Sequence, residues 1–291
     1  MDQHFERIAR RLSTLELRRP DADDDDALDA MKPGSPFGRV PRRFVGTYSA
    51  AGLGTVIHEY GLDAKLRAQG LGDYRLVVTD EDPFRHRLQL VLPEGAHAMD
   101  MHIHLRTLVD GADVVVVEWL RMQNPRARFT RERPRLPGQE HPGTGLGRDV
   151  AQLLVLMCRH IGRDGLVTVP ERFHLAELYA RGGWRAALPA ADLELDDVLA
   201  GTRALSLAER AWAVARGFVR DGDGAPYVYV PRERVLPVSE RMQARGFGAL
   251  DAVARLAHAL HRRPFTVDVE GLARSLAADP VEGMDPAHIQ R

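Results

Sequence analysis

The stretch 143–184 constrains the fold of this 291-residue chain more than any other part of it. It begins with a glycine-rich turn, Gly143-Thr144-Gly145-Leu146-Gly147, that leads straight into an apolar helix pattern. The spacing then predicts a short strand over 166–169 and a second helix over about 170–181, which stops at Gly182-Gly183. A turn, helix, strand and helix in this order are typical of a mixed α/β domain.

The glycine-rich turn indicates an anion site. Glycine reaches positive φ without steric cost and lets the backbone approach a ligand closely. A helix that starts at such a turn offers unpaired N–H groups and the positive end of its dipole. A phosphate or pyrophosphate is the natural occupant, although a tight loop that only caps a core helix gives the same pattern.

Charge and composition narrow the function classes. The net charge of -1 and the pI of about 6.9 predict neither a nucleic-acid nor a membrane partner. The single cysteine, Cys158, lies in an apolar helix pattern, which favours a buried residue over a catalytic thiol. No apolar run has membrane-spanning length, and the N-terminus lacks an apolar signal core, so we expect a cytoplasmic protein. Arginine far outnumbers lysine, as in GC-rich bacterial genomes.

The N-terminal part predicts one helix and a linker. Apolar residues on one helical face predict an amphipathic helix over 3–17. The acidic run 21–26 and the Pro/Gly-rich segment 33–41 are typical of a solvated linker. Residues 44–60 are ambiguous, and Gly52-Leu53-Gly54 within them is a candidate for a second glycine turn. A short helix is predicted over 62–69.

Four strands are predicted before the glycine-rich turn. A short segment at 74–78 and alternating segments at 85–92 and 99–108 predict the first three, the last with His102 and His104 on its polar face. The near-continuous apolar run 114–120 predicts a central strand that is covered on both faces. Glu118 interrupts this run, and a carboxylate in such a strand must be paired, neutral or at a cleft.

A loop rich in arginine is predicted between this strand and the turn, over 123–143. Guanidinium groups bind phosphate with bidentate hydrogen bonds, so the loop could supply cations to an anion site. A solvated loop explains the same arginines equally well.

The part after Trp184 is predicted to be mostly helical. Ser206 and Glu209 form a capping-box pattern, which predicts a helix that runs to Phe218. A short strand is predicted over 227–230, and the residues from Pro280 on are predicted to be frayed. Further helices are predicted over 190–200, 249–262 and 268–278.

These elements resemble the GCN5-related N-acetyltransferase superfamily. The resemblance rests on the order of a strand with an acidic residue (114–120), the turn Gly145-Leu146-Gly147-Arg148, a helix, a strand, and the ending Leu178-Tyr179-Ala180-Arg181-Gly182-Gly183-Trp184. It covers roughly residues 74 to 187 and is most specific over 143–184. It implies an α+β fold with a central, mostly antiparallel sheet flanked by helices, followed here by a helical C-terminal extension. The domains expected are 1–43 (helix and linker), 44–188 (acyltransferase) and 189–291 (extension).

The resemblance also implies a reaction, the transfer of an acyl group from acetyl-CoA or another acyl-CoA to an amine. Glu118 would be the base for the amine, and Tyr179 would protonate the departing thiolate. The pantetheine arm would lie along the central strand at Trp119, Leu120 and Arg121. The pyrophosphate would bind Gly143, Thr144, Gly145, Leu146, Gly147 and Arg148. No metal is expected.

Two other functions fit the same sequence. His102 and His104 share a strand face, and with His58, His141 or His174 and a carboxylate they would form a hydrolytic zinc site. Alternatively, the acyltransferase-like part is a non-catalytic ligand-binding or scaffold module, and the C-terminal helices bind a partner protein.

Overall fold

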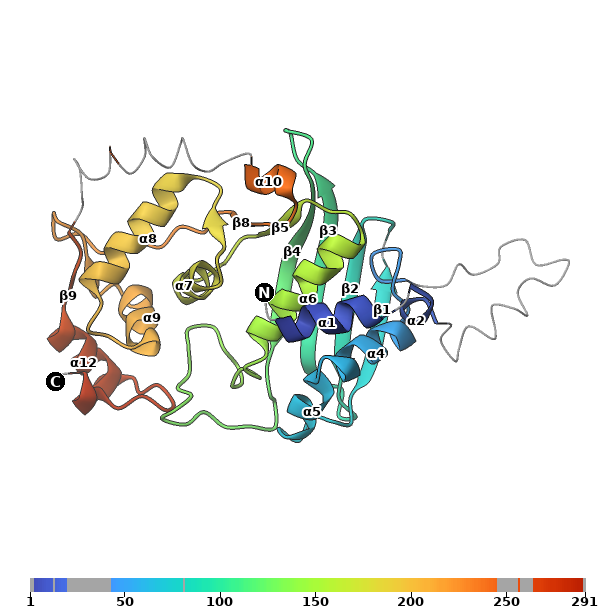
Figure 1. Ribbon diagram of the computed structural model, residues 1–291. Coiled ribbons are helices and arrows are strands. Elements are labelled where there is room, and N and C mark those ends of the chain that lie inside the picture. Colours follow the sequence, from blue (N-terminus) through green and yellow to red (C-terminus); the bar gives the residue numbers. More distant parts are fainter. Residues whose placement is uncertain are drawn as a thin grey trace, which may run out of the picture. The chain divides into compact units, whose positions relative to one another are not determined.

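A computed structural model describes residues 3–12, 14–19, 43–80, 82–244, 256 and 264–289 (Figure 1). The predicted acidic linker and the predicted helix over 249–262 lie outside the described residues, apart from residue 256. The chain forms two compact units, the first comprising 1–126 and 143–166 and the second 127–142 and 167–291. The chain passes from one unit to the other at 126–127, at 142–143 and at 166–167.

The first unit contains a mostly antiparallel sheet, as predicted. Its strand order is β1-β2-β3-β4-β5, and β5 contributes its first two residues to this unit. Consecutive strands from β1 to β4 pair in antiparallel fashion. The bounds are Arg75–Asp80 (β1), Arg85–Val91 (β2), His97–Thr107 (β3), Asp113–Met122 (β4) and Gly165–Thr168 (β5).

The alternation of side chains along β3 explains how this sheet is oriented. Met101, Ile103 and Leu105 are buried, while His102 and His104 are only partly covered. Successive side chains on a strand point to opposite faces, so one face of β3 is apolar and the other is polar. The sheet therefore presents its histidines on the face opposite to its apolar core.

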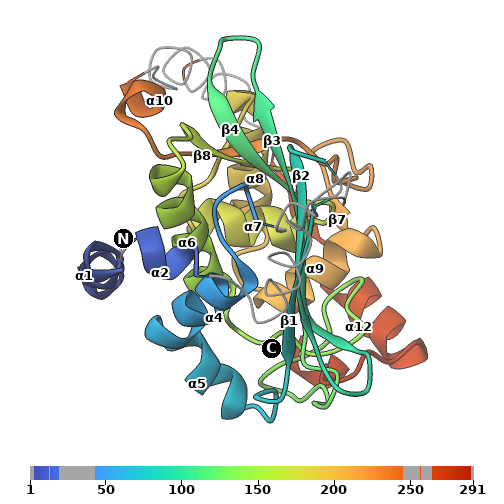
Figure 2. The ribbon, with the colours of Figure 1, turned by 90° about the vertical axis from the view of Figure 1, so that its right-hand side faces the viewer.

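Helices of the first unit cover the apolar face of the sheet. Figure 2 shows α4, α5 and α6 on one side of the strands. The α6 helix places Val150, Leu154 and Met157 on its buried side. The bounds are Gln3–Arg11 (α1), Thr14–Leu17 (α2), Ala50–Glu59 (α4), Leu62–Arg67 (α5) and Gly147–His160 (α6).

The Gly52-Leu53-Gly54 segment lies inside the α4 helix, so the prediction of a second glycine turn was wrong. The Ser49 side chain caps this helix by accepting a hydrogen bond from the Gly52 amide. A Cβ atom on Gly52 would lie 2.1 Å from the Leu17 carbonyl oxygen, whereas one on Gly54 would meet nothing within 4 Å. Gly52 is thus required by the close approach of α2 to α4, which no local pattern reveals.

These two glycines give a matched pair of variants. We expect Gly52→Ala to destabilise the first unit by about 1–3 kcal/mol, because the helices must separate. We expect Gly54→Ala to stabilise it by about 0.5–1 kcal/mol, the usual gain for alanine inside a helix. Urea unfolding followed by circular dichroism measures both. Equal effects for the two variants would contradict the packing of α2 on α4.

The second unit is mostly helical and has its own apolar core. Its strands are ordered β5-β8-β6, with a separate β7-β9 pair. Val198, Leu272 and Leu276 are fully buried in the core. The helices are Phe173–Arg181 (α7), Pro189–Gly201 (α8), Leu207–Ala215 (α9), Glu240–Ala244 (α10), Val269–Ala278 (α12) and the 3-10 turn Pro286–His288 (η2); the strands are Arg185–Ala186 (β6), Val219–Arg220 (β7), Arg234–Pro237 (β8) and Thr266–Val267 (β9).

Two sequence predictions fail in this unit, whereas the helices predicted over 190–200 and 268–278 are present as α8 and α12, and the predicted capping box is also found. Residues 227–230 form no strand, because the chain bridges to β7 only at Pro226. The residues after Pro280 are packed rather than frayed, since Val281 and Ile289 are buried in the core. The capping box is present, with both the Ser206 and the Glu209 hydrogen bonds formed.

No helix within the described part of the chain is both long and apolar enough to cross a membrane.

Candidate functional site

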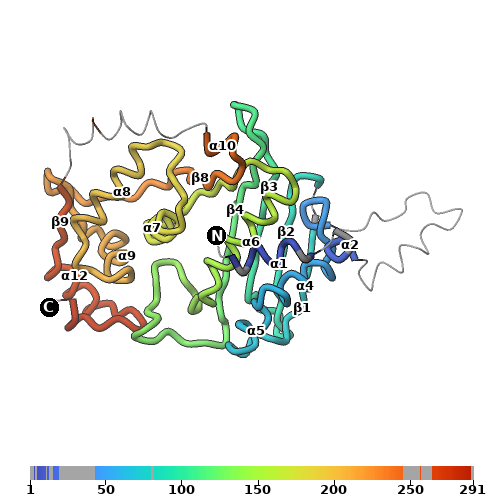
Figure 3. The backbone as a smooth tube through the Cα atoms, viewed as in Figure 1, coloured from blue at the N-terminus to red at the C-terminus, as the bar shows by residue number. Residues whose placement is uncertain are grey.

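The glycine-rich turn is hydrogen-bonded to the end of β4. Gly143 forms a β-bridge with Gln123, and the Thr144 amide donates to the Met122 carbonyl at 3.3 Å. The Gln69 side chain donates to the Thr144 carbonyl at 2.9 Å. Figure 3 follows the chain from β4 around the long loop and back to the start of α6. The turn therefore lies beside the strand that carries Glu118.

The turn ends in an uncapped helix terminus. Gly145 has φ of 74°, a conformation that favours glycine, and Gly145, Gly147 and Arg148 are exposed. The first residue before α6, Leu146, provides no side-chain cap. The first backbone bond of the helix runs from Val150 to Leu146, at 3.0 Å. The N–H groups of the first turn thus precede the helical ladder, as an anion site requires.

One ion pair lies at this helix terminus. Asp149, in the first turn of α6, accepts from the Lys65 ammonium of α5 at 2.6 Å. A carboxylate here is favoured by the helix dipole, and it competes with an external anion. Lys65 offsets the charge of Asp149, and its side chain is about half exposed, at 51%.

Several arginines of the long loop have carboxylate partners within their own unit. Arg126 forms hydrogen-bonded ion pairs with Asp73 and Glu94 in the first unit. In the second unit Arg131 lies 3.5 Å from Asp285, and Arg135 lies 3.8 Å from Glu282. These three arginines anchor the loop to the protein. Their guanidinium groups are already paired with carboxylates, which favours a structural role for them over phosphate binding.

Glu118 is the extra residue of a β-bulge in β4. On β3, His102 pairs with Trp119 and the next residue, Ile103, pairs with Val117, so Glu118 has no partner opposite to it. A bulge redirects a side chain and is frequent beside active sites. It turns Glu118 outwards, where 44% of the side chain is exposed and Oε1 lies 3.6 Å from His104 Nδ1. The central strand is thus not covered on both faces at this point.

A second carboxylate, Asp100, organises the polar face of β3. Arg87 donates to both of its oxygens, each at 2.8 Å, and His102 Nε2 lies 3.3 Å away. Burial opposes the ionisation of Asp100, but the hydrogen bonds and charge of Arg87 outweigh it, and the pKa of Asp100 is lowered. Neither Arg87 nor Asp100 was predicted from the sequence, although Asp100 shares the alternation of His102 and His104.

The residues expected to hold a pantetheine arm follow the bulge on β4. Trp119 is 42% exposed, while Leu120 and Arg121 are half-buried. Trp119 and Arg121 pair with His102 and Asp100, so they share the polar face, and Leu120 lies on the opposite one. An aromatic surface next to a polar cluster is thus available to a ligand on this face.

The histidines do not assemble as the zinc hypothesis expects. Each of His102 and His104 has a carboxylate neighbour of its own, and His58 is 75% exposed. His174 is buried in α7 of the second unit, where burial lowers its pKa to about 4. Among the residues that the structure describes, no group of three or more His, Cys, Asp and Glu side chains could hold a metal ion.

Tyr179 and Cys158 occupy interior positions. Tyr179 belongs to the second unit, packs edge-on against Trp184 and hydrogen-bonds with the Thr168 side chain. Its burial raises its pKa, which keeps the phenol protonated. Cys158 is fully buried, its thiol donates to the Gly165 carbonyl at 3.3 Å, and burial raises its pKa to about 12. Cys158 is therefore an interior residue, as predicted.

Comparison with known proteins adds no assignment. No known family model matches the sequence, and a search of curated proteins found no match.

Proposed function

We propose that this protein is an acyl-CoA-dependent N-acyltransferase. The observation that carries the proposal is the exposed, uncapped N-terminus of α6, joined through the glycine-rich turn to the strand that displays Glu118. The succession β4, turn, α6, β5, α7 supports it, because the resemblance to the GCN5-related N-acetyltransferases rests on the same order.

In this proposal the cofactor lies along β4. The phosphates accept from the N–H groups at Gly147 and Arg148, and the arm runs past Arg121 and Trp119 towards the bulge. The glycine-rich turn joins β4 at Met122, four residues after Glu118. A strand rises about 3.3 Å per residue, so the phosphate end of the site lies about 13 Å from the proposed base. An extended carrier arm, rather than a compact one, fits this distance.

The chemistry proposed is direct transfer. The amine nitrogen attacks the thioester carbonyl, the C–S bond breaks, and the proton of the amine passes to Glu118. The departing thiolate takes up a proton from water; Tyr179, the donor that the resemblance implies, belongs to the second unit. His104, whose Nδ1 lies 3.6 Å from Glu118 Oε1, is positioned to orient the carboxylate. The acceptor is an amine on a small molecule or a protein.

A second candidate function is ligand binding without turnover. The observation that favours it is the 44% exposure of Glu118, since general bases are more often shielded from water. This non-catalytic module would bind acyl-CoA at the same turn, and a protein partner through the helices of the second unit. Tight CoA binding with no acyl transfer to any amine would favour this alternative.

Gly147 provides a specific test of the phosphate site. A Cβ atom here would meet only the Met122 methyl at 3.7 Å, so small side chains fit. We expect Gly147→Asp to weaken CoA binding at least about tenfold, because a carboxylate competes with phosphate for the same N–H groups. The same change should leave the melting temperature unchanged or raised, because an acidic residue suits a helix N-terminus.

The control is Gly147→Ala, which adds a side chain without a charge. In a thermal-shift experiment, acetyl-CoA should raise the melting temperature of wild type and of Gly147→Ala, and should raise that of Gly147→Asp much less. Identical shifts for the three proteins would place any CoA site elsewhere.

A further inference from the structure

The first unit contains an apolar cavity, partly open to solvent, between its sheet and its helices. The walls come from α1, α2, α4, α5, α6 and the glycine-rich turn on one side and from β2, β3 and the end of β4 on the other. Representative lining residues are Ile57, Leu90, Met101, Leu146, Val150 and Leu154. All of the residues around the cavity belong to the same compact unit.

The cavity is too large for an ordinary packing defect. Its volume is about 140 Å³. Protein interiors are close-packed, and few natural voids exceed the size of a water molecule. A cavity of about 150 Å³ with comparable walls in another protein stays dry and binds benzene, so this one has room for a group of about six carbons.

A small number of polar groups accompany these apolar walls. Tyr48, Tyr60, Thr144 and His160 also line the cavity, and the rings of Tyr48 and His160 lie 5.6 Å apart. Within the described part of the chain, neither phenolic oxygen is hydrogen-bonded to another residue. Burial raises the pKa of both tyrosines, that of Tyr60 to about 12, so both hydroxyls remain donors. Apolar walls with a few polar groups are typical of small-molecule sites.

This cavity shares Thr144 and Leu146 with the glycine-rich turn, but it lies on the face of the sheet opposite to Glu118 and His104. Met99 and Met101 line it, and side chains alternate along a strand, so it lies on the apolar face of β3. His102, and Trp119 opposite to it, lie on the other face, as does His104 beside Glu118. A ligand in the cavity would therefore not occupy the position of the acyl group at Glu118.

We infer that the cavity is a binding site for a small apolar molecule, an aliphatic chain or ring of about six carbons with one hydrogen-bonding head group. The hydrocarbon part fills the space between α4, α6 and the sheet. The head group bonds with the hydroxyls of Tyr48 and Tyr60. The inference of this binding site does not depend on acyl transfer, and the experiments that test the two are independent.

The probe for this site is 1-hexanol, with 1,6-hexanediol as a control that carries a polar group at both ends. Alcohols in general weaken folded proteins, so a rise in melting temperature with hexanol requires a specific site. We expect millimolar hexanol to raise the melting temperature of the full chain, and hexanediol to lower it or leave it unchanged. Tyr48→Phe should reduce the rise with hexanol.

Two variants of one helix locate the site. Val150 of α6 lines the cavity, whereas Val155 of the same helix does not. Val150→Phe fills the space and should weaken hexanol binding at least tenfold, while Val155→Phe should bind as wild type does. Equal binding by both variants, or no rise with hexanol in wild type, would overturn the inference.

Hydrogen exchange on the wild-type chain gives a second test that needs no variant. Hexanol should slow amide exchange in α4 and α6, the helices over the cavity. This test remains valid if Val150→Phe does not fold. The inference would be overturned if hexanol left the amide exchange rates of both α4 and α6 unchanged.

Discussion

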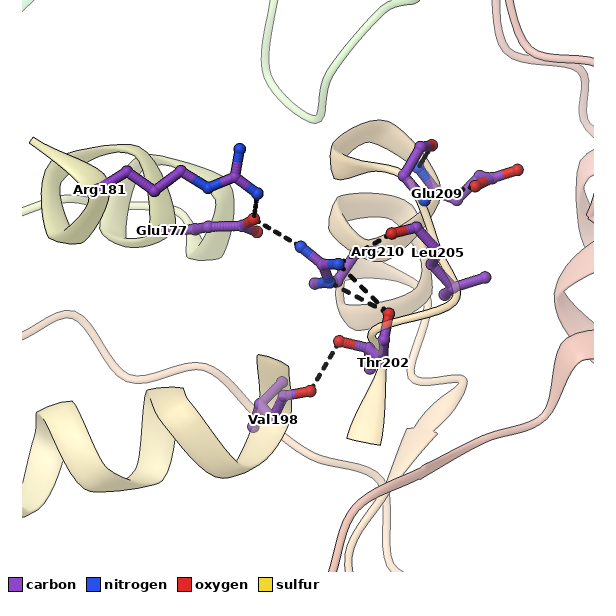
Figure 4. A network of polar contacts seen from close by, with 8 residues as sticks. Glu177, Arg181, Val198, Thr202, Leu205, Glu209 and Arg210 are labelled. Atoms are coloured by element: carbon purple, nitrogen blue, oxygen red, sulfur yellow. Dashed lines mark hydrogen bonds and ion pairs between the residues drawn. The ribbon is translucent and has the colours of Figure 1, made fainter. Parts of the chain in front are cut away.

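Replacing Arg210 with methionine is expected to lower the free energy of unfolding by about 3–5 kcal/mol, because it leaves a buried carboxylate without its main partner. Arg210 of α9 and Glu177 of α7 are 7% and 1% exposed, and they form an ion pair at 2.5 Å (Figure 4). Arg210 also donates to the carbonyls of Leu205, at 2.8 Å, and Thr202, at 3.3 Å. The second oxygen of Glu177 is buried and has no hydrogen-bond partner among the described residues.

The matched control is Arg181→Met, because Arg181 pairs with the same Glu177 oxygen from the surface. Its side chain is 61% exposed, and exposed ion pairs contribute about 1 kcal/mol or less. Denaturant unfolding followed by circular dichroism compares the two. The double variant Glu177→Leu with Arg210→Met should recover most of the loss, since an apolar pair can replace a buried ion pair. Similar losses for Arg210→Met and Arg181→Met would contradict this description of the network.

The second large effect concerns turnover. Under the proposed function, Glu118→Gln removes the proton acceptor, and we expect acyl transfer to slow by about 10²–10⁴-fold, the usual contribution of a general base. The affinity for acetyl-CoA should stay within about twofold of wild type, because the phosphates bind at the other end of β4. Release of free thiol from acetyl-CoA with a panel of amines measures turnover, and calorimetry measures affinity.

Glu94→Gln is the control for Glu118→Gln. Glu94 is a carboxylate of the same unit with nearly the same exposure, 45% against 44% for Glu118. It pairs with Arg126, and we expect its loss to leave turnover unchanged. Equal rates for Glu118→Gln and wild type would rule out Glu118 as the base.

Periodicity in the sequence predicted most of the secondary structure. Alternating segments became β1 to β3, and the apolar pattern after the glycine-rich turn became α6. The errors occur where packing decides the outcome. The close approach of the Leu17 backbone requires glycine at position 52, and Ile289 packs into the core of the second unit. Neither segment shows a regular hydrophobic pattern in the sequence.

The candidate site was only partly predictable. The glycine-rich turn was visible because its conformation requires particular residues, such as Gly145 at positive φ. The bulge at Glu118 was not, because the register between β3 and β4 depends on both strands together. The pairing of Arg87 with Asp100 depends in the same way on which residues of β2 and β3 face each other.

The proposed binding of CoA phosphates by the first turn of α6 can be measured by calorimetric titration of the wild-type chain. Pantetheine is the control ligand, because it has the arm and the thiol but no phosphate. We expect one CoA bound per chain, with at least about tenfold weaker binding of pantetheine, because charge-assisted hydrogen bonds are lost. No heat with CoA, or equal affinity for the two ligands, would contradict this proposal.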